Sequence, residues 1–142
     1  MAIDQLSVFV ENKQGKLVEV LEALGQAGID LRALSIADTA DYGVLRVIVD
    51  RPVDALKVLT DLGFAVRINQ VLPVSVDDAP GALGNTLRVL SDAGIFVEYL
   101  YAFVAHGEDR AFVILRVADN EGAEKVLRGR GIAIASKEEI YK

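Results

Sequence analysis

Two acidic residues, Asp77 and Asp78, stand one residue before Pro80 and Gly81 in the stretch from Val74 to Ile95. We expect an apolar strand before these acids and a helix after the glycine. The first N–H groups of a helix have no partner within it and attract anions, and a carboxylate attracts an ammonium group. Gly81 lacks a Cβ atom, so a ligand can approach its backbone closely. Because an α-amino acid carries both charges, these residues together suit its zwitterion.

The same residues also allow a purely structural interpretation. An aspartate before a helix commonly caps the helix start, and a proline is frequent just inside it. Asp78 would then only bind the N–H groups of its own helix. The residues by themselves leave both interpretations open.

The stretch has a counterpart earlier in the chain, so the sequence contains an internal repeat. A shift of 66 residues places Val8 over Val74, Gly15 over Gly81 and Leu24 over Leu90. After a small insertion in the second copy, a shift of 68 places Lys57 over Lys125 and Gly63 over Gly131. One module is therefore written twice.

Hydrophobic periodicity predicts the order β-α-β-β-α-β in each copy. We expect residues 1–69 to form one domain and residues 70–142 a second, with a polar and loosely held tail over 136–142. The fold class is α+β, a ferredoxin-like fold duplicated in tandem. The predicted strands are 5–10, 31–37, 44–49, 64–69, 71–76, 96–104, 111–117 and 132–135, and the predicted helices are 16–27, 54–62, 82–93 and 121–128.

Composition and missing motifs exclude several classes of function. The net charge of −6 argues against a protein that binds nucleic acid by itself, and no run of about 18 apolar residues predicts a membrane span. Without cysteine or a signal peptide, we expect a cytoplasmic protein. The only histidine, His106, is expected in a turn at 105–109 that Arg110 continues as a solvated tip. We therefore expect no enzyme activity, no cofactor and no metal.

The repeated element order resembles that of ACT domains, which are regulatory modules that bind amino acids. The resemblance also rests on the pattern Asp-Ala-Pro-Gly-Ala-Leu at 78–83 and on Ala-Gly-Ile at 93–95. It covers residues 3–135. It implies that the two modules pair, and we expect them to form an eight-stranded antiparallel sheet with helices on one face. It also implies that ligands bind at the interface of the pair.

The resemblance implies two unequal sites, each built from a loop of one module and a strand start of the other. The first combines Asp30 with Asp77, Asp78, Ala79, Pro80, Gly81, Ala82 and Leu83. The second combines Phe96 with Glu11, Asn12, Lys13, Gln14, Gly15, Lys16 and Leu17. Gln14 replaces the proline and Phe96 replaces a polar residue, so we expect the second site to be weaker, altered or structural.

The resulting functional prediction is a small stand-alone regulatory protein that binds a free amino acid between its two modules. Such a protein acts on a separate metabolic enzyme or regulator, and we expect it to be a homodimer. An alternative is an oligomerisation or docking module for a partner enzyme that binds no ligand.

Overall fold

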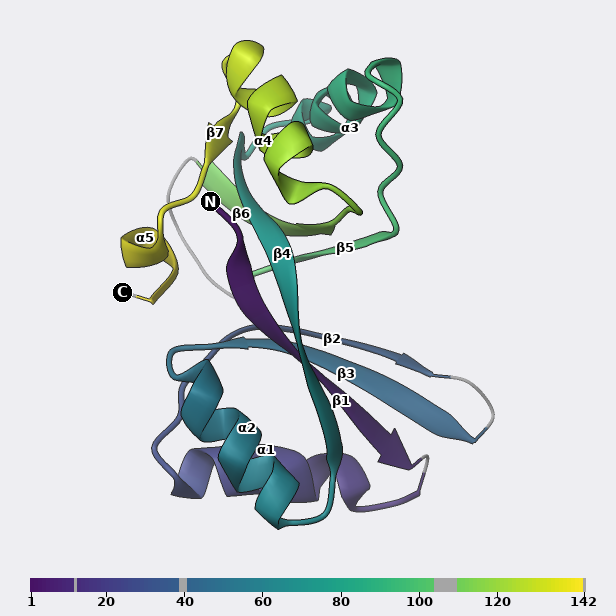
Figure 1. Ribbon diagram of the computed structural model, residues 1–142, viewed down its shortest axis with the longest axis vertical. Coiled ribbons are helices and arrows are strands. Elements are labelled where there is room, and N and C mark those ends of the chain that lie inside the picture. Colours follow the sequence, from purple (N-terminus) through teal and green to yellow (C-terminus); the bar gives the residue numbers. More distant parts are fainter. Residues whose placement is uncertain (12, 39–40, 104–109, 142) are drawn as a thin grey trace. The chain divides into compact units, whose positions relative to one another are not determined.

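The computed structural model describes residues 1–11, 13–38, 41–103 and 110–141. The chain forms two compact units (Figure 1), which we describe one at a time. The first unit is Asp4–Asn69, and the second combines Met1–Ile3 with Gln70–Lys142. Asn12 of the predicted second site, residues 39–40 between the predicted strands 31–37 and 44–49, and the predicted turn 105–109 with His106 lie outside the described residues.

The first unit is an antiparallel sheet with two helices. Its sheet has the order β2-β3-β1-β4, to which β4 contributes its first residues. The helices α1 and α2 lie together on one side of these strands in Figure 1. The elements are β1 (Ile3–Glu11), α1 (Lys16–Gln26), β2 (Leu31–Asp38), β3 (Tyr42–Val49), α2 (Pro52–Asp61) and β4 (Ala65–Asp77).

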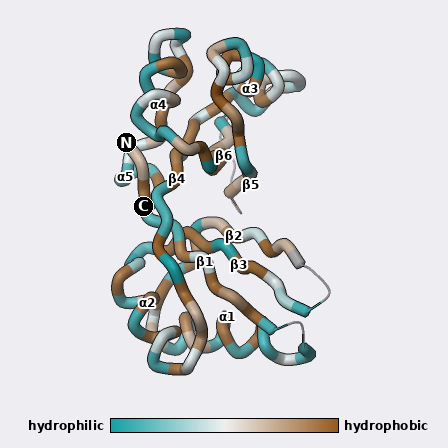
Figure 2. Tube along the Cα trace, turned by 45° about the vertical axis from the view of Figure 1, so that its right-hand side comes forward, coloured by the Kyte–Doolittle hydropathy of each residue, from teal (hydrophilic) through white to brown (hydrophobic). Residues whose placement is uncertain are grey.

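The hydrophobic core of the first unit follows from the predicted periodicities. Alternate residues of β1, Leu6, Val8 and Val10, are buried and pack with Val20 and Leu24 of α1. Figure 2 shows the amphipathic pattern as hydrophobic and hydrophilic stretches alternating along α1 and α2. Burial of these apolar faces is what holds the helices against the sheet.

The second unit repeats this architecture. Its sheet has the order β5-β6-β4-β7, again antiparallel. Val74 and Val76 of β4 form the core with Leu90 and Leu127, at positions that the repeat aligns with core residues of the first unit. The prediction of a tandem β-α-β-β-α-β fold is therefore confirmed. The elements are α3 (Ala82–Asp92), β5 (Tyr99–Ala102), β6 (Arg110–Arg116), α4 (Asn120–Gly129), β7 (Ala133–Ile134) and α5 (Lys137–Tyr141). The pairing of the two sheets into one stays a prediction.

Three predicted strands differ clearly from the structure. The strands expected at 64–69 and 71–76 are one continuous strand, β4, of 13 residues, because no turn residue interrupts the run between them. The strand expected at 96–104 is shorter, since β5 begins only at Tyr99. Phe96 therefore lies outside the strand, with 77% of its surface exposed.

The prediction of a loosely held polar tail is wrong. Residues 137–141 form the helix α5, and the Ile140 side chain is fully buried. The Ser136 hydroxyl accepts a hydrogen bond from the Glu139 N–H (3.1 Å), and the Glu139 carboxylate accepts one from the Ser136 N–H (3.0 Å). This reciprocal arrangement is a capping box, and its spacing is visible in the sequence.

None of the helices among the described residues is long and apolar enough to cross a membrane.

Candidate functional site

The loop between β4 and α3 presents an open helix start. Residues 78–81 are exposed, and Gly81, at φ 83° and ψ −8°, immediately precedes the first turn of α3. The Ala82 N–H donates to the Ala79 carbonyl (3.2 Å), and the Asn85 N–H donates to the Gly81 carbonyl (2.9 Å). No side chain caps this helix, so the N–H groups of Leu83 and Gly84 remain available to an anion.

Asp78 does not cap α3, which removes the structural interpretation of this residue. The cap position belongs to Gly81 and carries no side-chain hydrogen bond. The chain does use an aspartate cap at α4, where Asp119 Oδ1 accepts a hydrogen bond from the Gly122 N–H (3.1 Å). The carboxylate of Asp78 therefore stands exposed at the loop.

The left-handed backbone of Gly81 leaves space beside the loop. A positive φ of this size is strained for any residue with a Cβ atom. A Cβ built at Gly81 would meet nothing within 4 Å. A ligand can therefore approach the backbone at this point, as the sequence predicted from the residue type.

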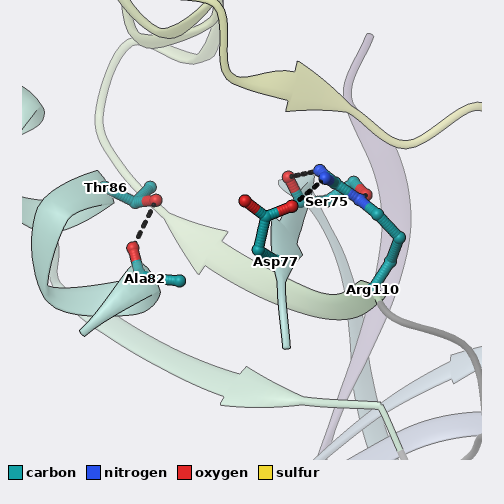
Figure 3. A network of polar contacts seen from close by, with 5 residues as sticks. All are labelled: Ser75, Asp77, Ala82, Thr86 and Arg110. Carbon is teal, nitrogen blue, oxygen red and sulfur yellow. Dashed lines mark hydrogen bonds and ion pairs between the residues drawn. The ribbon is translucent and has the colours of Figure 1, made fainter. Parts of the chain in front are cut away.

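Asp77 forms an ion pair with Arg110, which is the first residue of β6 (Figure 3). The two residues stand opposite each other in the β4–β6 register. Arg110 also donates from Nε to Ser75 Oγ (2.9 Å) and from a terminal nitrogen to the Ser75 carbonyl (2.7 Å). The expectation that Arg110 forms a solvated turn tip is therefore wrong. The expected pairing of the predicted strands 71–76 and 111–117 was the signal that could have found this pair.

A cavity of about 190 Å³ lies beside the Asp77–Arg110 pair. Its wall combines the end of β4, the first turns of α3, Arg110 and the backbone before β7. On the α3 side, the Thr86 hydroxyl donates to the Ala82 carbonyl (3.1 Å), as Figure 3 shows. The polar side chains in the wall are Ser75, Asp77, Asn85, Thr86 and Arg110.

Asp30, the predicted complement of this loop, lies directly before β2 in the first unit. Its carboxylate is paired with Arg32 (2.9 Å), and its N–H donates to Asp50 Oδ1 (3.0 Å). The Asp30 side chain is 63% exposed. The structure describes Asp30 and the 77–83 loop in separate units, so their meeting stays a prediction.

The corresponding loop of the first unit has the same backbone but different side chains. Gly15 has φ 88°, and no side chain caps α1. Lys13 pairs with Glu11 (3.1 Å) and Lys16 with Glu19 (3.5 Å). Cations thus stand around this helix start, Gln14 occupies the proline position, and Phe96 lies in the other unit.

The family model of the ACT domain pair matches residues 1–142. The chain belongs to this family. The resemblance stated from the sequence is thereby confirmed, and the family model covers both modules of the chain.

Solved structures share the fold of this chain. Protein BT0572 from Bacteroides thetaiotaomicron is 40% identical, with a TM-score of 0.92 over 100% of this chain and 97% of that one. The regulatory subunit of aspartate kinase from Thermus thermophilus is 18% identical, with a TM-score of 0.68 over 89% and 91% of the two chains. The equivalent subunit from Thermus flavus is 17% identical, with a TM-score of 0.63 over 89% and 90%. At these low identities the two kinase subunits share the fold alone. No curated protein sequence matches the chain.

Proposed function

We propose that this ACT domain pair binds a free amino acid and that the loop from Asp77 to Leu83 holds its charged groups. The observation that carries the proposal is the uncapped, open start of α3 at Gly81. The N–H groups of the first turn suit the ligand's carboxylate, since a helix start favours an anion. The exposed carboxylate of Asp78 suits the ammonium group.

The proposal keeps Asp30 as a second contact for the ammonium group, as predicted from the sequence. Its carboxylate already pairs with Arg32, so we expect a smaller effect from removing it than from removing Asp78. The 11–17 loop with Phe96 remains the weaker site, because the repeat places Asn12 at the position of the Asp78 carboxylate and Gln14 at that of Pro80.

We propose that the protein acts by regulating another protein. The aspartate kinase regulatory subunits have this fold as separate polypeptides, which supports a regulatory protein that is not itself an enzyme. We propose a homodimer that acts on a separate metabolic enzyme or regulator in the cytoplasm.

Ligand-induced thermal stabilisation tests the binding site. A panel of the twenty amino acids is screened against the wild type, and stabilisation should grow with ligand concentration as RT ln(1 + [L]/Kd). Asp78→Asn and Asp30→Asn are then compared with Asp61→Asn, which removes the same charge from an exposed position on α2. We expect Asp78→Asn to abolish most of the stabilisation, Asp30→Asn to reduce it, and Asp61→Asn to leave it unchanged.

A wild type that no amino acid stabilises would contradict the proposal and leave the ligand-free docking module. An undiminished shift in Asp78→Asn would show that the ligand binds elsewhere.

A further inference from the structure

The cavity beside the Asp77–Arg110 pair has the size of a small ligand group. Its volume is about 190 Å³, whereas a water molecule occupies roughly 30 Å³ in the liquid and pockets for drug-sized ligands begin at about 300 Å³. It adjoins α3 at Ala82, the first residue after the open loop. An amino acid bound at the loop can therefore place a short side chain in it.

The internal repeat shows that the fold does not require the polar wall of this cavity. In the first unit Glu11 pairs with Tyr42 in the strand register, at the place where Asp77 pairs with Arg110 in the second. The same register therefore forms without an arginine. Exposed ion pairs also contribute little to stability, and both side chains of the Asp77–Arg110 pair are substantially exposed.

The same divergence extends to the helix side of the cavity. The repeat places Glu19 and Val20 of α1 at the positions of Asn85 and Thr86 of α3. Val20 is a fully buried core residue, so an apolar side chain satisfies the packing at this position. The second copy therefore has an uncharged amide where the first has a carboxylate, and a hydroxyl where the first has an apolar side chain.

Two groups in the wall have hydrogen-bonding capacity left over. Arg110 donates three hydrogen bonds to described residues, one to Asp77 and two to Ser75, and a guanidinium group has five N–H donors. The Asn85 side chain takes part in no hydrogen bond among the described residues. It therefore offers both a donor and an acceptor to a ligand.

We propose that this cavity selects an amino acid with a short, uncharged polar side chain, and that Asn85 and Arg110 determine this specificity. The inference rests on the proposed function. Because Asp77 neutralises Arg110, the wall has no net charge and favours a hydroxyl or amide over a carboxylate or ammonium group. An apolar side chain would displace water from the exposed Asn85 amide and Arg110 N–H groups without replacing its hydrogen bonds, which disfavours its binding.

Matched ligand pairs test the proposal by calorimetry on the full chain. Threonine is compared with valine and asparagine with leucine, since the members of each pair have similar shapes. Of the two polar ligands, we expect the one that binds more tightly to have an affinity at least about tenfold higher than that of its apolar partner. The ratio of the affinities for the polar and the apolar ligand of the pair is then measured for Asn85→Leu and Arg110→Met. The control is Arg88→Met, because Arg88 is also an exposed arginine paired with an aspartate but does not line the cavity.

A ratio that collapses in Asn85→Leu and Arg110→Met, and persists in Arg88→Met, is the expected result. A wild type that prefers valine, leucine or a charged amino acid would overturn the specificity, as would an unchanged ratio in Asn85→Leu. In those cases binding that still depends on Asp78 leaves the proposed function intact. If no amino acid binds the wild type, both proposals fail. Circular dichroism checks folding, and Asn85→Leu, at an exposed helix position, tests the cavity even where Arg110→Met fails to fold.

Discussion

Replacing Gly81 by alanine separates the backbone strain of the loop from its role in binding. Gly81 has φ 83°, and an added Cβ meets no atom within 4 Å, so the change introduces strain without a clash. A residue with a Cβ atom in this conformation costs about 1–2 kcal/mol. For a chain of this size we expect the midpoint of thermal unfolding to fall by about 3–8 °C.

Gly15→Ala supplies the matched control, because Gly15 has φ 88° and equally open surroundings. Both variants should lose similar stability in calorimetric or circular dichroism melts. Only Gly81→Ala should also lose the stabilisation by amino acid, since its methyl group occupies the approach to the α3 start. At a ligand concentration of about 100 times Kd, that stabilisation is about 2.7 kcal/mol, larger than the strain and therefore resolvable from it.

Two results would refute this reasoning. If Gly81→Ala melts like the wild type, the left-handed conformation of the loop is wrong. If Gly81→Ala keeps the full ligand shift, the ligand does not approach the helix start at this point.

Other predictions concern the cores, the tail helix and acid stability. Leu24→Ala and Leu90→Ala truncate equivalent, fully enclosed core positions of the two units, so each should lower the free energy of unfolding by about 2–5 kcal/mol in denaturant titrations. Ile140→Ala should cost about 2–4 kcal/mol in the same assay, whereas a loosely held tail would give no change. Hydrogen bonding from the N-terminal ammonium group holds the pKa of the Glu124 carboxyl below its ordinary 4.5; burial opposes this and Arg128 adds to it. The ionised carboxylate therefore stabilises the fold above its unfolded pKa, and this stabilisation disappears as the pH falls through the folded pKa. Glu124→Gln should accordingly lower the melting temperature near pH 7, and this loss should shrink as the pH falls through the folded pKa; a loss that does not shrink with falling pH would contradict the assignment.

Local patterns in the sequence predicted the elements that short-range physics governs. The alternation of Leu6, Val8 and Val10 and the helical spacing up to Leu24 placed the core faces of the first unit. The glycine turn at Gly81 was predicted from residue type, and the capping box of Ser136 was present in the sequence although the prediction of a loose tail overlooked it.

Features that depend on distant residues were not predicted. The role of Asp78 was open because capping depends on the exact path of the loop, and the structure gives the cap position to Gly81. Arg110 was assigned to a turn, since its partner Asp77 lies 33 residues away and meets it only through the strand register.

The sequence by itself therefore determined the duplicated β-α-β-β-α-β module, its core positions and the family, because each is encoded in spacings of a few residues and in the repeat. Three features were decided by the tertiary structure alone. Asp78 does not cap α3 and is exposed, Asp77 pairs with Arg110, and a small polar cavity lies beside this pair. These features arise where β4, α3 and β6 converge, and only the packing of the folded chain brings their side chains together.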